Sequence, residues 1–193
     1  MEDTRFPRIV SLACHDLRTP LATIHGFAQT LIRMGDLGEP KQRYMEMIDM
    51  ASRQLAELLD ELGTAARIES GRYEPSLQSV QTLELAHAAA AQLGEDRVKV
   101  SGEGTEVHVD PESTERGVSA LAQASLRHGG LDKVTLNVDG VKLAITPVTA
   151  SSAPVVLGED LRDLGAAVAA RVVRALGGTV ELDGDTLTIT LPK

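Results

Sequence analysis

Three side chains that can do nucleophilic chemistry stand close together near the start of the chain. His15, Asp16 and Thr19 lie in the stretch SLACHDLRTPLATIHGF, residues 11–27. An imidazole beside a carboxylate can act as a nucleophile, because the carboxylate fixes the ring tautomer and accepts a proton, which leaves one ring nitrogen able to attack. A hydroxyl four residues further along a helix lies one turn away. These three residues are therefore the candidate catalytic residues.

The element that carries them is a predicted helix over 6–34. Apolar residues recur at the three- and four-residue intervals of one helical face: Val10, Ala13, Leu17, Leu21, Ile24, Ala28 and Leu31. At about 100° per residue, His15 lies nearly opposite this stripe and faces solvent, Thr19 shares its face, and Asp16 lies on the flank. Pro20 lacks an N–H, so we expect a bend just beneath the site.

A second helix is predicted after a break at Gly35, Gly38 and Pro40. Its apolar residues alternate steps of four and three, which is a heptad seam: Tyr44, Ile48, Ala51, Leu55, Leu58, Leu62 and Ala65. Gly71 ends the pattern. Two long helices joined by a short turn form a hairpin that covers its apolar stripe only in part, which favours a dimeric four-helix bundle. The alternative is that residues 72–193 cover the stripe within one chain.

The pattern after residue 72 is that of a small α+β domain, a mixed sheet with helices on one face. We expect helices over 80–93, 111–128 and 160–176, and strands over 98–100, 107–109, 134–138 and 141–145, with a closing hairpin of 180–182 and 187–191. Asp139-Gly140 is the expected turn between two of these strands, and 147–158 the expected loop.

Composition excludes several function classes. Of 193 residues, 42% are hydrophobic, enough for a core, but only 2% are aromatic, which argues against sites built on stacked bases. The formal net charge of −9 argues against nucleic acid and anionic membranes. The single cysteine excludes a disulfide framework and fits a reducing compartment. The chain opens without an apolar leader and contains no run of 18 apolar residues, so we expect a cytoplasmic protein.

The stretch His15-Asp16-Leu17-Arg18-Thr19-Pro20-Leu21 closely resembles the H-box of sensor histidine kinases. In that family a two-helix hairpin pairs into a four-helix bundle for dimerisation and histidine phosphotransfer. The resemblance implies that His15 is the phosphoacceptor, that Asp16 is the neighbouring acid/base, and that Thr19 can orient water for dephosphorylating a partner. It divides the chain into a helical hairpin over 1–71, a linker over 72–78 and an ATPase-like domain over 79–193.

The second domain resembles the family's ATP-binding domain in scaffold, since 163–180 is similar to the glycine box with its helix and strand. Its ligand-binding residues differ. The family places asparagines where this chain has Ala120 and Ala124, the latter position being a Mg²⁺ ligand, and alanine offers no oxygen to a hard cation. Thr146 and Pro147 stand where an adenine-binding aspartate is expected, Asp163 replaces the first glycine of the box, and the loop is short for a nucleotide lid.

These departures predict a degenerate ATP-binding domain, as in bacterial histidine phosphotransferases with an inactive catalytic domain. We expect a homodimeric protein of two-component signalling, a phosphorelay component that carries a phosphoryl group on His15 to or from aspartates of response-regulator receiver domains. We expect no cofactor, no metal of its own and no ATP binding, with Mg²⁺ supplied by the receiver domain. The other histidines lack ligand spacing: His25, His87, His108 and His128.

The expected partners of this protein are a second copy of the chain, a receiver domain and an upstream histidine kinase. We expect it to bind neither nucleic acid nor a membrane. Three alternatives stay open. The chain could be an active or weakly active histidine kinase, a phosphatase of response regulators that acts through Thr19, or a non-enzymatic dimeric scaffold.

Overall fold

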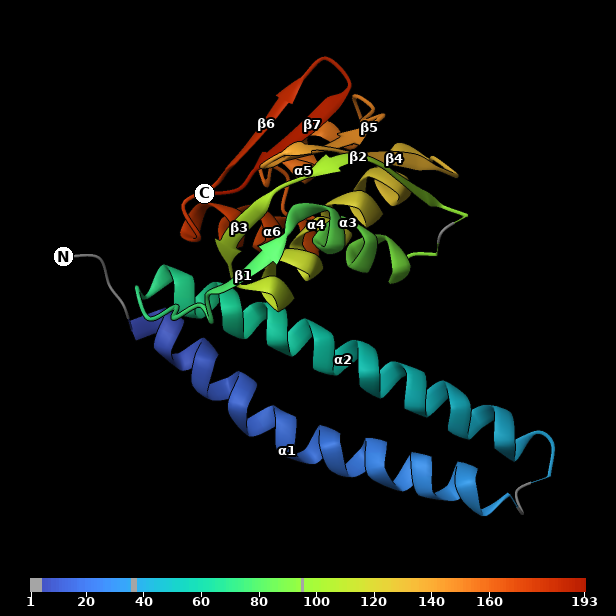
Figure 1. The fold of residues 1–193 in the computed structure, drawn as a ribbon. Coiled ribbons are helices and arrows are strands. Elements are labelled where there is room, and N and C mark those ends of the chain that lie inside the picture. Colours follow the sequence, from blue (N-terminus) through green and yellow to red (C-terminus); the bar gives the residue numbers. More distant parts are fainter. Residues whose placement is uncertain (1–4, 36–37, 95) are drawn as a thin grey trace. The chain divides into compact units, whose positions relative to one another are not determined.

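The computed structural model describes residues 5–35, 38–94 and 96–193 (Figure 1). In the first helix it describes the backbone but leaves out the side chains of Arg5, Phe6, Arg8, Ile9, Ser11, Leu12, Ala13 and Asp16. The chain divides into two compact units, residues 1–72 and 73–193. None of the helices in the described part is both long enough and apolar enough to cross a membrane.

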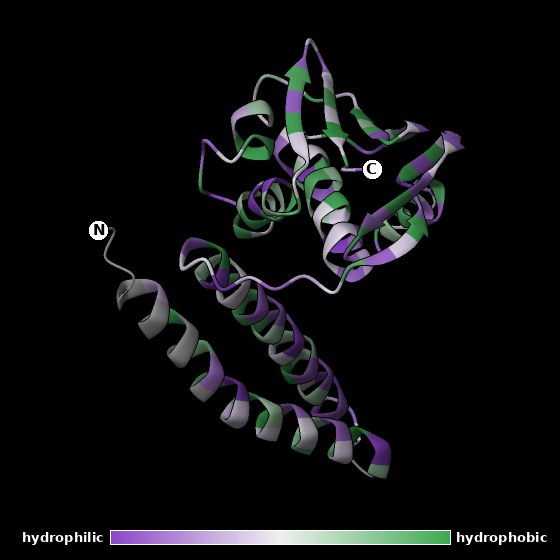
Figure 2. Cartoon of the chain, turned by 60° about the vertical axis from the view of Figure 1, so that its left-hand side comes forward, coloured by the Kyte–Doolittle hydropathy of each residue, from purple (hydrophilic) through white to green (hydrophobic). Residues whose placement is uncertain are grey.

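The first unit is a helical hairpin. Helix α1 (Arg5–Met34) and helix α2 (Lys41–Glu69) run side by side in opposite directions (Figure 1). Pro20 lies inside α1, and Gly35 and Gly38 adopt positive φ angles in the turn, where a residue with a side chain would be strained. Hydrophobic and hydrophilic residues alternate in bands along both helices, as Figure 2 shows. The predicted hairpin is therefore confirmed.

The contact between α1 and α2 uses small or polar side chains of α2. The buried residues of α2 are Asp49, Ser52, Gly63 and Ala66, and those described on α1 are Cys14, Leu21 and Ala28. Most of the predicted seam stays exposed, with Leu17 54% and Leu55 51% accessible. The heptad positions of α2 thus lie outside the hairpin contact, whereas Leu21 and Ala28 of the apolar stripe of α1 are buried in it.

The second unit is an α+β domain. Its elements are β1 (Gln78–Gln81), α3 (Thr82–Ala91), β2 (Val98–Gly104), β3 (Glu106–Val109), α4 (Pro111–Gly129), β4 (Val134–Gly140), β5 (Lys142–Thr146), α5 (Ala153–Val156), α6 (Leu164–Ala175), β6 (Thr179–Asp183) and β7 (Thr186–Thr190). Five strands form one sheet in the order β2-β4-β5-β7-β6, and β1 pairs with β3 in a separate ribbon. Only β2 and β4 are parallel, because the chain crosses between them through α4.

The sheet is covered on one face. Along β4, Val134, Leu136 and Val138 are buried while the residues between them are exposed, the alternation of a half-solvated sheet. Helices α3, α4 and α6 lie together on the covered side (Figure 1). The predicted fold class, a mixed sheet with helices on one face, is confirmed.

Two predicted helices of this unit begin later than their sequence pattern indicates. The helix expected over 80–93 starts at Thr82, because residues 78–81 pair with β3, and Gln78 at the end of the expected linker already belongs to β1. The helix expected over 160–176 starts at Leu164, because the Asp163 carboxylate accepts a hydrogen bond from the Ala166 N–H and caps the helix there.

Two loop predictions also need correction. Residues 147–158 are not all loop, since they contain the short helix α5. Asp139 pairs with Lys142, so the turn between β4 and β5 consists of Gly140 and Val141, one residue later than predicted. Gly140 has a φ of 58°, which places the glycine at the first central turn position.

Candidate functional site

His15 is exposed on α1, while its neighbour Cys14 is 3% accessible. Consecutive helical residues point about 100° apart, so one faces α2 and the next turns away from it. The exposure agrees with the face assigned to His15 from the spacing of apolar residues. An exposed imidazole is accessible to a protein partner.

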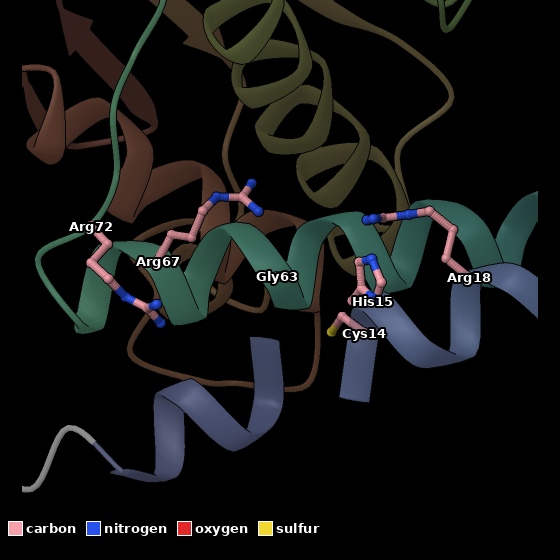
Figure 3. Close-up of a pocket in the computed structure, with 6 residues that line it drawn as sticks. All are labelled: Cys14, His15, Arg18, Gly63, Arg67 and Arg72. Atoms are coloured by element: carbon pink, nitrogen blue, oxygen red, sulfur yellow. The ribbon is translucent and has the colours of Figure 1, made fainter. Parts of the chain in front are cut away.

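A hollow lies between α1 and α2 on one side of His15 (Figure 3). It has a volume of about 320 Å³ and is lined by Cys14, His15, Arg18, Gly63, Arg67 and Arg72. We call it the arginine hollow, because three of these residues are arginines. Figure 3 shows Cys14, His15 and Arg18 on α1, Gly63 and Arg67 on α2, and Arg72 just after α2 ends.

A second, more open hollow lies along α1 and has a volume of about 500 Å³. Its lining consists of His15, Arg18, Thr19, Ala22 and Thr23. The structure therefore brings His15 and Thr19 to one surface, as one helical turn requires. Asp16 lies in α1, but its side chain is outside the described part, so its position relative to His15 is not assigned.

Arg18 ties the two helices together beside His15. Its Nη2 atom lies 2.6 Å from Oδ1 of Asp60 on α2, with both side chains about half exposed. An exposed ion pair contributes little to stability, about 0–1 kcal/mol. Its main effect is to hold one guanidinium group close to the imidazole.

A polar cluster joins the helices near the turn. The Asp49 carboxylate on α2 accepts hydrogen bonds from Gln29 Nε2 at 2.9 Å and Arg53 Nη2 at 2.7 Å, and it lies 2.9 Å from His25 Nδ1. The hydrogen bond from Gln29 lowers the pKa of Asp49, as do the nearby Arg53 and His25, while burial opposes them. The pairing with His25 rests on this short distance, since its buried Nδ1 atom makes no hydrogen bond among the described residues.

In the second unit, the positions expected to bind Mg²⁺ and adenine carry no such chemistry. Ala124 on α4 is fully buried and Ala120 is half-buried, so both side chains pack as apolar groups. Thr146 ends β5, where its Oγ1 lies 3.1 Å from that of Thr186. Among the described residues, no group of three or more His, Cys, Asp or Glu side chains is arranged to hold a metal ion.

The N-terminus of α6 is capped by the chain itself. One oxygen of Asp163 accepts the Ala166 N–H at 3.1 Å, and the other lies 2.9 Å from His128 Nε2 and 3.5 Å from Arg127 Nη1. A helix N-terminus can bind a phosphate through its N–H groups and dipole. In this chain the Asp163 carboxylate already occupies the N-terminus of α6, and the side chains of Arg127 and His128 on α4 lie next to that carboxylate.

Arg67 and Arg72 belong to none of the motifs that the sequence displays. Both come from the end of α2, far from the reactive stretch in sequence, so only the pairing of the two helices brings them near His15. A usable signal existed in the pair Gly63 and Arg67, because a spacing of four places them on one helical face.

Comparison with known proteins identifies the first unit. Residues 8–71 match the His Kinase A (phospho-acceptor) domain. The chain is 29% identical over 118 residues to the probable sensor histidine kinase TcrY of Mycobacterium tuberculosis, covering 55% of this chain and 25% of that protein. It is 26% identical over 227 positions to an uncharacterized sensor-like histidine kinase of Rhizobium meliloti, covering 98% and 42%. The chain thus spans less than half the length of either relative.

Two solved structures share the fold over nearly the whole chain. Full-length ShkA in complex with AMPPNP has a TM-score of 0.68 and 19% identity, over 96% of this chain and 46% of ShkA. The histidine kinase AdeS of Acinetobacter baumannii has a TM-score of 0.61 and 19% identity, over 92% and 97%. The chain is thus similar to histidine kinases in both units: its hairpin matches their phospho-acceptor domain, and its α+β domain shares the fold of solved histidine kinases.

Proposed function

We propose that this chain is a homodimeric phosphotransfer protein of two-component signalling that does not use ATP itself. His15 carries a phosphoryl group to or from an aspartate of a response-regulator receiver domain. The observation that carries the proposal is the contrast between an exposed His15 in a phospho-acceptor hairpin and the Asp163 carboxylate at the expected phosphate position of the second unit.

The exposed seam of the hairpin supports dimerisation. Large apolar side chains are accessible along both helices: Leu17, Ile24 and Leu31 on α1, and Tyr44, Ile48, Leu55, Leu58 and Leu62 on α2. Apolar residues at heptad spacing pack best between helices. A second copy of the hairpin presents the same seam, so a closed four-helix bundle covers both.

The residues of the second unit support the part of the proposal that the chain does not use ATP. A nucleotide brought to α6 would place its phosphate against Asp163, and the negative charges would repel each other. No side-chain oxygen at Ala120 or Ala124 could offset this repulsion by holding a cation. In this proposal the unit serves as a docking and packing domain.

The transfer itself needs only the exposed ring. A nitrogen of His15 attacks the phosphorus of the receiver's aspartyl phosphate, the bond between phosphorus and the aspartyl oxygen breaks, and the carboxylate is regenerated. The reverse reaction phosphorylates the receiver. We assign Mg²⁺ to the receiver, Asp16 to acid/base work beside the ring, and Thr19 to orientation of water when the phosphoryl group is hydrolysed instead.

The test uses the full chain and a receiver domain phosphorylated with labelled acetyl phosphate and freed of the reagent. We expect label to appear on the chain, to be lost in the His15→Ala variant, and to be kept in Thr19→Ala. A parallel incubation with γ-labelled ATP and Mg²⁺ is expected to leave the chain unlabelled.

Other outcomes select the alternatives. Label from ATP on His15 would make the chain an active kinase. Loss of label from the receiver without label on the chain, abolished in Thr19→Ala, would make it a phosphatase; this variant is informative because Thr19 and His15 line the same hollow. Binding of the receiver with neither reaction would favour the scaffold.

A further inference from the structure

The arginine hollow is a local concentration of positive charge in an acidic protein. The chain has a formal net charge of −9, yet the described residues that line the hollow include three arginines and the imidazole of His15, and no carboxylate. Arg18 is partly neutralised by Asp60 at 2.6 Å. The other two arginines decide what the hollow can bind.

Arg67 and Arg72 contact only neutral groups in the described part of the chain. Arg67 Nη2 donates to Thr64 Oγ1 at 2.8 Å, and Arg72 Nε donates to Ser70 Oγ at 3.1 Å. Each contact uses one of the five N–H donors of a guanidinium group. Both arginines therefore keep their charge and most of their donors available to an anion.

Gly63 keeps the floor of the hollow open. It lies inside α2 with no positive φ, where glycine disfavours helix relative to alanine. A Cβ atom there would lie 3.6 Å from Arg67 Nη1 and 3.8 Å from Cys14 Cβ, which are ordinary contacts. Neither backbone conformation nor a clash calls for glycine at this position, whereas the missing side chain leaves room for a ligand beside the Arg67 guanidinium group.

We propose that the arginine hollow is a binding site for a phosphate-class oxyanion, held by Arg67 and Arg72 beside His15. Guanidinium groups bind such anions through paired, charge-assisted hydrogen bonds, and a phosphoryl group offers three acceptor oxygens. The role of the site, to position a phosphoryl group on or next to His15, rests on the proposed function. The binding itself does not.

The test titrates the full chain with inorganic phosphate and follows the arginine Nε–Hε signals by NMR. We expect saturable shifts at Arg67 and Arg72, and an affinity roughly tenfold weaker in the double variant R67Q/R72Q, which loses two charge-assisted contacts. Arg43→Gln is the matched control, because Arg43 lies exposed on the same helix outside the hollow. Sodium chloride at equal ionic strength controls for screening.

A second arm asks whether the anion is free or attached to His15. Phosphoramidate phosphorylates histidine without ATP: the ring nitrogen bonds to phosphorus, the P–N bond of the reagent breaks, and ammonia leaves with the ring proton. Shifts of the same arginine signals in the phosphorylated chain, with no free phosphate present, identify the phosphoryl group of His15 as the occupant. Shifts with inorganic phosphate alone identify the free anion.

The inference is overturned if inorganic phosphate and phosphorylation both leave the Arg67 and Arg72 signals unchanged, or if chloride reproduces the shifts. It is also overturned if R67Q/R72Q and R43Q weaken phosphate binding equally. Failure of the proposed function gives a different pattern: phosphate binds in the wild-type chain and in His15→Ala, while no label passes between the chain and a receiver.

Discussion

The two units of this chain bury opposite kinds of residue. In the α+β unit the largest side chains are fully buried, among them Leu85, Leu121 and Leu136. In the hairpin the leucines of the seam, such as Leu55 and Leu62, are exposed, and the buried residues of α2 are small or polar.

This difference indicates how each unit is stabilised. The α+β unit completes its own core within one chain, since its helices and sheet enclose one continuous cluster of apolar residues. The hairpin leaves its largest apolar surface uncovered, and most helical stability in proteins comes from packing of such a surface. The hairpin therefore depends on a partner surface to bury its large apolar side chains, whereas the core of the α+β unit is complete without one.

The largest expected effect comes from placing charge on the exposed seam. In L55E/L62E, every copy would bring two carboxylates into the bundle, where burial of unpaired charge is unfavourable. We expect the dimer dissociation constant to rise at least about a hundredfold, with loss of helical signal at low protein concentration. Light scattering after gel filtration and circular dichroism measure these changes.

Gln54→Glu is the matched control, because it adds charge at an exposed position of α2 outside the seam. It is expected to leave the mass unchanged. A wild-type chain that is monomeric at all concentrations would contradict the difference between the two units.

Truncation of a core side chain tests whether the α+β unit is stabilised within one chain. Leu121 is fully buried, so Leu121→Ala leaves a cavity and is expected to lower the unfolding free energy of the α+β unit by about 2–5 kcal/mol. Denaturant unfolding measures this loss, which should not depend on protein concentration. The matched variant Leu55→Ala should show a loss that grows as the protein is diluted. If the loss of stability depended on protein concentration equally in both variants, the proposed difference between the two units would be wrong.

A smaller effect is expected at the cap of α6. Asp163→Ala removes the acceptor of the Ala166 N–H, which is expected to lower the stability of the α+β unit by about 1 kcal/mol. Asp163→Asn keeps an acceptor and removes the charge, so it should restore most of that loss. Thermal unfolding separates the two variants. If Asn is as destabilising as Ala, the charge facing Arg127 and His128 matters more than the cap.

The smallest expected effect is the response of the hairpin to acid. The pKa of Asp49 is lowered in the folded hairpin, so its contribution to stability is complete above the unfolded pKa of about 4 and is lost as the pH falls through the lower folded value. We expect the hairpin of Asp49→Asn to lose less stability than the wild type as the pH falls from about 5 to about 3. Helical melting curves at these pH values measure the difference, and identical acid profiles would contradict it.

The sequence predicts the elements better than their ends. Apolar spacing suffices for both hairpin helices, and the Asp110 cap with Pro111 marks the start of α4, where Asp110 accepts the Ser113 N–H. The alanine-rich stretch that follows Val80 favours a helix, but pairing of β1 with β3 overrides that preference at Val80. Such pairing depends on residues distant in sequence.

In the candidate site, too, local spacing can be predicted from the sequence and contacts between distant segments cannot. His15 and Thr19 share a surface because they are one turn apart on one helix, which spacing alone predicts. Arg67 and Arg72 line the same hollow as His15 only because two antiparallel helices are aligned, and no sequence pattern near the end of α2 specifies that alignment. The heptad seam of α2 can likewise be predicted from the sequence. The sequence does not show that α2 contacts α1 through the adjacent face.

The polar cluster at Asp49 has a consequence for distances along the hairpin. His15 precedes Gln29 by fourteen residues, and Gly63 follows Asp49 by fourteen, so the Gln29–Asp49 bond lies two heptads from the point where His15 and Gly63 line one hollow. That separation is about 21 Å along the helix axis. A buried polar pair specifies the alignment of packed helices more strictly than apolar contacts do. The Asp49 cluster therefore fixes the register of the two helices. Sliding one helix by a single turn, about 5.4 Å, would break the cluster and move Gly63 and Arg67 away from the imidazole of His15.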